Sequence, residues 1–354
     1  MGRITVAPSR LLWFAVVCLA TLTFPVANGL QIPSQKTSSS FERSPLFSAR
    51  LQAAGDPDDT SALDLTTSTT TAAAAAAAFD QTVSNRYACT RFQRFDGNMT
   101  SVDTPSPSDP AVVKEALEAL DLARRAPSGF NAQPYKCLFV YSKESKAALA
   151  SYCCGRNAHR VRDSDCTVVF LADREVMWSL GKYQTMMESQ NPKWKERPWG
   201  MRKIKALVVL FSQGFPLPKF LAGPISFGMR LGVSLLAFLT RAWYPLPTWS
   251  SAETWSQKNT MLVAMTYLLA CTSRNLATSP MEGYNVAGIR RVLKIPRQYT
   301  IPMIVSTGTP YQRETIPDDV GVSHGLPQTS AGTPRYPMED MIFGNEFGNG
   351  MSLA

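Results

Sequence analysis

The loop at residues 126–135 gathers side chains that could bind a polar ligand. Pro127 and Pro134 fix their own φ angles and keep the preceding residues out of the α region, so this loop must be shaped and non-helical. The residues that could donate or accept hydrogen bonds, or let the backbone approach a bound group, are Ser128, Gly129, Asn131 and Gln133. Proline, serine, glycine and asparagine are common turn residues, so composition alone favours an ordinary structural turn, with a binding loop as the alternative.

Other chemically reactive side chains are scarce in this chain. His159 and His324 are its only histidines, which leaves little material for a zinc site or a histidine-based catalytic triad. Six of the seven cysteines follow the leader and none of them forms a C-x-x-C pair, so we expect no disulfide framework. The net charge is +9, but no basic stretch is interleaved with aromatic residues along one face. We therefore expect no nucleic-acid binding.

Four separated motifs resemble, in the same order, those of the nitroreductase family of flavoproteins. The loop at 126–135 is similar to the family's A-P-S-x-x-N-x-Q-P-W loop, with Tyr135 at the aromatic position. Residues 86–92 (R-Y-A-C-T-R-F) are similar to R-x-S-x-R/K followed by Phe, and 279–284 (S-P-M-E-G-Y) are similar to P-x-E-G-F/Y. Residues 334–337 (P-R-Y-P) are similar to x-R-x-P. The resemblance covers about 79–347.

This resemblance implies which residues hold the flavin. In the family, cations of the first and last motifs contact the FMN phosphate, while the other two motifs lie against the flavin. The residues carried over by position are Arg86, Ala88, Thr90, Pro127, Ser128, Gly129, Asn131, Gln133, Asn157, Pro280, Glu282, Gly283 and Arg335. Ala88 replaces the family's Ser, and Thr90 replaces its second cation, with Arg91 one residue along. Arginine suits this position because its planar fork matches a phosphate group.

The resemblance also implies a fold, a reaction and a partner. The expected fold is α+β, an antiparallel-rich mixed sheet flanked by helices, with two FMN sites at a homodimer interface. The expected reaction is ping-pong: NAD(P)H reduces FMN, and a nitroaromatic, quinone or similar acceptor then takes the electrons. Two alternatives remain open. One is a specialised relative, such as a reductive dehalogenase or a flavin oxidase of a plastid metabolite, and the other is a non-catalytic flavin-binding protein associated with a membrane.

Local patterns predict the elements that position these motifs. Asp109 and Pro110 begin a helix that runs to Arg125 and delivers the loop at 126–135. The β-rich runs 137–141 and 166–171 should be central strands, and 301–307 should be another strand. A capping box at 250–253 opens a long helix to about Asn275, which its apolar residues predict to be buried nearly all round.

Residues 207–248 form an unusually apolar, proline-studded insertion. Its longest uninterrupted apolar stretch is too short to span a bilayer. The insertion is therefore either a lid that covers the active site or a helix that lies on a membrane surface, and we favour the lid.

The first 78 residues differ in composition from the rest. Residues 1–29 have the basic start, apolar run and small residues of a signal peptide. Residues 30–78 combine a Ser-rich, acid-poor stretch typical of a transit peptide with a Thr/Ala-rich segment expected to be a disordered spacer, with a short alanine helix as the alternative. We place the folded domain at 79–354 and expect a plastid destination, with secretion or membrane association as alternatives.

Overall fold

The computed structural model describes residues 65–93, 105–213, 219–239, 250–310 and 335–352. The predicted signal peptide (1–29), the first part of the transit-like segment (30–64) and residues 240–249 of the insertion lie outside these ranges.

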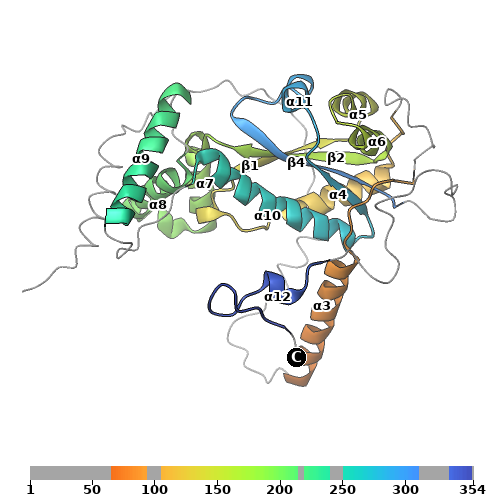
Figure 1. Cartoon of the computed structure of the whole chain (residues 1–354), viewed down its shortest axis with the longest axis horizontal. Helices are drawn as coiled ribbons and strands as arrows, with labels where there is room; N and C mark the ends of the chain where they lie inside the picture. Colours follow the sequence, from red (N-terminus) through yellow and green to blue (C-terminus); the bar gives the residue numbers. More distant parts are fainter. Residues whose placement is uncertain (1–64, 94–104, 214–218, 240–249, 311–334, 353–354) are drawn as a thin grey trace, which may run out of the picture.

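A four-stranded sheet forms the centre of the molecule, with strand order β1-β2-β4-β3 and antiparallel pairing throughout (Figure 1). Its strands are β1 (Tyr135–Val140), β2 (Cys166–Asp173), β4 (Tyr299–Gly308) and β3 (Ala277–Met281). The predicted strand at 166–171 is central, but β1 is at an edge, so the prediction of a central strand at 137–141 is wrong in its position. One isolated parallel bridge joins Ala88 to Thr278 beside the other edge.

Helices cover both faces of the sheet. On one face, α4 (Pro110–Ala123) and α10 (Ala252–Thr272) pack against inward side chains of β2 and β4, including Phe170 and Val305. On the other face, residues of α5 (Lys143–Ala150), α6 (Arg156–Asp163) and α11 (Val286–Val292) enclose Val169, Met281 and Ile304. Figure 1 shows these two helical layers on opposite sides of the strands. The predicted α+β class, with an antiparallel sheet flanked by helices, is confirmed.

The two predicted helix starts are present, one with a shifted cap. Asp109 caps α4 because its Oδ1 accepts the N–H of Ala111 at 2.9 Å. At α10 the cap is Ser251, whose Oγ accepts the N–H of Thr254 at 3.1 Å. The predicted capping box around Glu253 is therefore one residue out of register.

Helix α10 is less enclosed than its composition predicted. Leu262 and Met265 keep 46% and 43% of their surface exposed, while Val263, Ala264 and Tyr267 are buried in the core. An apolar side chain can pack equally well inside one chain or against another, so hydrophobicity alone does not distinguish a core face from an interface face. The prediction that this helix is buried nearly all round is wrong for the single chain.

The Thr/Ala-rich segment is helical where it is described. Helix α3 spans Leu65–Asn85 and contacts α10. The expected disorder is thus not seen over residues 65–78, where the alternative of an alanine helix applies, because alanine has the highest helix propensity.

The remaining helices lie at the ends of the molecule. The segment before α10 contains η2 (Val176–Ser179), α7 (Leu180–Gln190), η3 (Pro192–Trp194), α8 (Pro198–Ser212) and α9 (Lys219–Leu239). These gather at one end of the sheet, while α12 (Met338–Met341) lies away from the strands (Figure 1). Within the described residues, no helix combines the length and apolar character needed to cross a membrane.

Candidate functional site

The predicted binding loop joins α4 to β1 and is anchored on α10. It contains one short turn, η1 (Gly129–Asn131), and is otherwise irregular. The N–H of Gly129 donates to Oδ1 of Asn259 at 2.7 Å. A Cβ at Gly129 would lie 2.9 Å from the ring of Trp255. The glycine therefore permits close packing against α10, where the sequence had suggested approach to a ligand.

The polar side chains of this loop hold its shape. Gln133 donates its backbone N–H to Oγ of Ser128 at 3.0 Å and its side-chain amide to Oδ1 of Asn131 at 3.2 Å. Phe130, Asn131 and Gln133 all have positive φ. Such strain in non-glycine residues persists only where surrounding contacts fix it, and it occurs often at functional sites.

The insertion and α7 support the outer side of the loop. The hydroxyl of Tyr183 donates to the carbonyl of Phe130 at 2.9 Å. The ring of Phe211, at the end of α8, lies 5.4 Å from the ring of Phe130. In contrast, Phe227 and Phe238 on α9 are 60% and 78% exposed, so in the described chain they do not close over the loop as a lid.

A second group of predicted residues meets beyond the end of β3. Pro280 lies within this strand, which is at the sheet edge, where proline is tolerated because the outward N–H needs no partner. The carbonyl of Gly283 accepts the side-chain amide of Asn157 at 3.1 Å and the backbone N–H of Cys154 at 3.0 Å. A Cβ at Gly283 would stand 2.7 Å from Nδ2 of Asn157. Position 283 must therefore be glycine if Asn157 is to keep this place.

Arg160 belongs to this second group, although the sequence analysis missed it. Its Nη1 donates to Oδ1 of Asn157 at 3.0 Å, and its Nε is buried without a hydrogen-bond partner. Burial lowers its pKa, the nearby Cys89 raises it, and the cation of Arg156 lowers it. Residues three apart on a helix share a face. The spacing from Asn157 was the signal that could have identified this arginine.

The N-terminal motif reaches the same sheet edge. Ala88 bridges Thr278 of β3, and the N–H of Cys89 donates to the Thr278 carbonyl at 2.7 Å. Burial raises the pKa of the Cys89 thiol to about 11, so it is neutral at pH 7. Arg86 directly follows the end of α3, and Thr90 lies further along the same segment; both are half-buried.

The structure thus divides the predicted residues among three places. Ala88, Asn157, Pro280 and Gly283 come together with Arg160 at the β3 edge, and we call this group the β3-edge cluster; the exposed Glu282 adjoins it in sequence. The loop that contains Pro127 and Ser128 precedes β1, the opposite edge strand. Arg335 is exposed and precedes α12, which lies away from the sheet (Figure 1).

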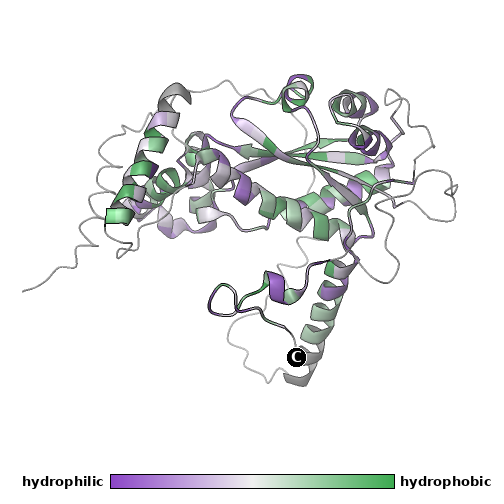
Figure 2. Cartoon of the chain, viewed as in Figure 1, coloured by the Kyte–Doolittle hydropathy of each residue, from purple (hydrophilic) through white to green (hydrophobic). Residues whose placement is uncertain are grey.

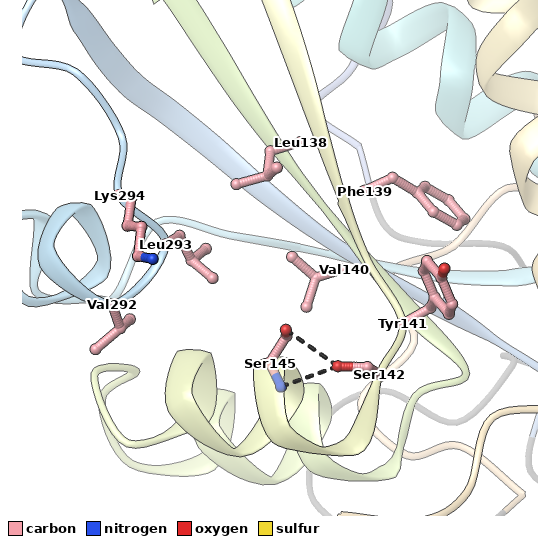
Figure 3. A pocket seen from close by; sticks show the side chains of 9 residues that line it. All are labelled: Leu138, Phe139, Val140, Tyr141, Ser142, Ser145, Val292, Leu293 and Lys294. Carbon is pink, nitrogen blue, oxygen red and sulfur yellow. Dashed lines mark hydrogen bonds between the residues drawn. The ribbon is translucent and has the colours of Figure 1, made fainter. Parts of the chain in front are cut away.

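A hollow of about 370 Å³ lies elsewhere, between β1, α5 and α11. Figure 3 shows Leu138 and Val140 of β1 facing Val292 and Leu293, with Ser142 and Ser145 bonded to each other at its margin. None of the predicted site residues lines it. We therefore do not assign the binding site to this hollow.

These contacts define an α+β protein with a polar cluster at a sheet edge and a strained loop at the other. The sequence model described as "Nitroreductase family" matches residues 234–309, which include α10, β3 and β4. This match confirms the resemblance to the nitroreductase family that the motifs predicted. No curated protein matches the chain.

Several solved structures of that description are similar at low identity. A putative nitroreductase from Bacillus subtilis has 17% identity and a TM-score of 0.49, covering 75% of this chain and 98% of its own. A nitroreductase family protein from Streptococcus pneumoniae has 19% identity and a TM-score of 0.47, with 75% and 98% coverage. A putative nitroreductase in complex with FMN from Exiguobacterium sibiricum has 17% identity and a TM-score of 0.44, with 75% and 95% coverage.

Proposed function

We propose that the protein is an FMN-dependent oxidoreductase that passes electrons from NAD(P)H to a nitroaromatic, quinone or similar small acceptor. The observation that supports this most is the β3-edge cluster, in which three segments distant in the sequence meet. Residues 87–92, the start of α6 and the end of β3 contribute to it. These are the positions that the family resemblance assigns to the cofactor.

The residues of the cluster fit a flavin phosphate. Arg160 contacts the neutral amide of Asn157 and has no carboxylate partner among the described residues. Cys89 beside it stays protonated because burial raises its pKa to about 11, so the thiol does not neutralise the arginine. A half-buried guanidinium with a free Nε is suited to an anionic, planar or phosphate-bearing ligand.

The division of labour follows from these contacts. FMN, when bound, supplies the hydride and electron chemistry, so no side chain needs to act as a nucleophile. Arg160 and Arg86, together with Arg335 as the family resemblance implies, would hold the phosphate. Asn157 would present its amide in the orientation fixed by Arg160 and Gly283. The protein's own task is to bind, orient and partly exclude water.

We propose a homodimer as the complete unit. The β3-edge cluster and the Ser128 loop belong to opposite edges of the sheet, and the loop is held by α7 at the end of the molecule distant from α6 (Figure 1). Three strand spacings separate the two edge strands by about 14 Å before the loop extends further outward. A second copy could place its loop beside this cluster, and the exposed Leu262 and Met265 of α10 offer an apolar surface for such contact.

The test is a visible spectrum of the purified protein with FMN, before and after NADPH. We expect a bound flavin spectrum that NADPH bleaches without oxygen and that an added quinone restores. Arg160→Ala should lose flavin, while Arg291→Ala on the exposed side of α11 should retain it. Protein that binds no flavin, or that binds it equally in both variants, would contradict the proposed site.

A mixing experiment tests the dimer separately. A loop variant, Ser128→Ala with Asn131→Ala, and a cluster variant, Asn157→Ala with Arg160→Ala, should each be inactive alone. A mixed dimer has one site in which the loop and the cluster are both intact, on different chains, and one site in which both are changed. It should therefore regain about half of the activity of the parent dimer. Absence of any regain in verified mixed dimers would contradict sites shared between chains.

We also propose delivery to a plastid through residues 1–29 and the transit-like segment that follows. Their composition supports this destination. Residues 1–78 fused to a fluorescent protein should direct it to the plastid, and accumulation in the secretory pathway would favour the alternative.

A further inference from the structure

Helix α9 carries an apolar face that points away from the molecule. Phe227, Leu231, Leu235 and Phe238 follow one another at spacings of four, four and three, so they share one side of the helix. All four are more than half exposed. Among the side chains of α9 that the structure describes, only that of Ser226 is buried. A helix on a water-facing surface normally turns its apolar residues towards the core.

Charged residues are almost absent from this helix. Lys219 and Arg230 are the only charged residues in its sequence, and neither lies between Phe227 and Phe238 on the exposed side. Arg230 is turned to the margin, where its Nε donates to the carbonyl of Ser226 at 3.3 Å. Figure 2 shows apolar residues along α9 at the outer end of the molecule. The composition of this face is therefore that of a surface buried against an apolar partner.

The segment leading into α9 is strongly basic and carries an exposed tryptophan. Residues 192–205 contain six cations and one acid. Trp199, at the start of α8, is 76% exposed, and the guanidinium of Arg202 lies 5.5 Å from its ring centre. Only residues 213–218 separate α8 from α9, and the two helices lie at the same end of the molecule (Figure 1). Tryptophan and cations beside an apolar helix are typical of proteins that lie in the headgroup region of a bilayer.

We propose that α9 and the Trp199 end of α8 form a docking surface for an anionic lipid membrane. The apolar face of α9 enters the upper acyl region, while Arg202 and Lys203 contact lipid phosphates. Charge favours lipid over a second copy of this chain, since two identical basic surfaces would repel each other and anionic headgroups would complement them. The helix lies along the surface, consistent with the absence of a membrane-crossing helix among the described residues.

Flotation of the full chain with lipid vesicles tests this proposal. Vesicles of phosphatidylcholine mixed with phosphatidylglycerol should carry the protein upward, and high salt should reduce the bound fraction because it screens exposed charges. Two variants change the surface: Phe227→Ser with Phe238→Ser, and Arg202→Glu with Lys203→Glu. Loss of the two cations alone should weaken partitioning roughly 30-fold, which corresponds to about 2 kcal/mol, and the two added carboxylates should weaken it further. The leader's apolar run is common to all proteins compared, so differences between variants report on α8 and α9.

Matched controls lie on α11 and directly after it, at another part of the surface. Arg291→Glu with Lys294→Glu, and Val286→Ser, change charge and exposed apolar area there and should float as the parent protein does. Equal unfolding midpoints should accompany all variants because each changed side chain is exposed. The proposal is overturned if the α8 and α9 variants float as well as the controls. It is also overturned if the Phe variants dissociate an oligomer without lipid, since a second copy would then cover this face.

Discussion

Replacing Gly283 by alanine should weaken FMN binding while lowering the free energy of unfolding of the cofactor-free protein only slightly. The new Cβ would stand 2.7 Å from Nδ2 of Asn157, so the Asn157 side chain must move and give up its bond to the Gly283 carbonyl. Arg160 then loses the amide oxygen that orients its guanidinium. The backbone itself stays unstrained, because Gly283 is not among the glycines with positive φ.

The magnitudes follow from these two hydrogen bonds. Asn157 is half-buried, so water can replace its lost partner, and the free energy of unfolding without FMN should fall by only about 1 kcal/mol. Loss of an oriented, charge-assisted contact to the cofactor should weaken FMN binding by about tenfold, or about 1.4 kcal/mol. At an FMN concentration 100 times the parent's Kd, cofactor stabilisation should fall from about 2.7 to about 1.4 kcal/mol.

Urea unfolding with and without FMN, combined with a titration of flavin fluorescence, measures both quantities. Gly181→Ala is the control, because no atom lies within 4 Å of its new Cβ and alanine is favoured in helix α7. Equal FMN stabilisation in the parent and in Gly283→Ala would refute the placement of the cofactor beside Asn157. A loss above about 3 kcal/mol without FMN would instead show that Gly283 supports the core.

Three further outcomes are expected. Arg335→Ala should weaken FMN retention more than Arg91→Ala, because Arg335 occupies the family's phosphate position and Arg91 is one residue out of register; equal retention would count against the alignment. Gly288→Ala should lower the free energy of unfolding by at least about 2 kcal/mol, since its Cβ would lie 1.9 Å from the ring of Tyr152, and a neutral urea midpoint would contradict this packing. Stability should fall as pH rises from about 8.5, the ordinary thiol pKa, towards about 11, the raised pKa of buried Cys89, because the unfolded thiol ionises first. Cys89→Ala should make that slope shallower in urea titrations at increasing pH, while other thiols whose pKa burial raises, such as Cys137 and Cys271, maintain the rest of it.

Local signals predicted the elements that local physics determines. Asp109 and Ser251 cap their helices with side-chain oxygens, and such caps are visible in sequence because the partner is only two or three residues away. The loop at 126–135 is non-helical as its prolines require. These features needed no knowledge of tertiary contacts.

Features that depend on distant partners were missed or misplaced. Strand β3 contains Pro280 and was not predicted, because only its pairing with β4 makes it a strand. β1 was expected to be central because its apolar run resembles a buried strand, yet only β2 pairs with it. Arg160 was missed although its spacing from Asn157 was a signal in the sequence, whereas its position beside Cys89 depends on the fold.

The four motifs form one series along the sequence, but the fold places the last of them, at Arg335, away from the sheet and divides the others between its two edges (Figure 1). Ala88 and Gly283 approach β3, while the Ser128 loop leads into β1, and no described contact joins the two groups. The family resemblance assigns both groups to one cofactor site, because the order of motifs in a sequence does not show which chain of a dimer supplies each residue. Helix α10 carries Asn259, which anchors the loop, and leads into β3, which ends at the cluster. Its exposed Leu262 and Met265 offer a surface through which a second chain could bring its loop beside this cluster. Each edge of the sheet carries only part of the proposed FMN site, and a second copy of the chain could supply the other part.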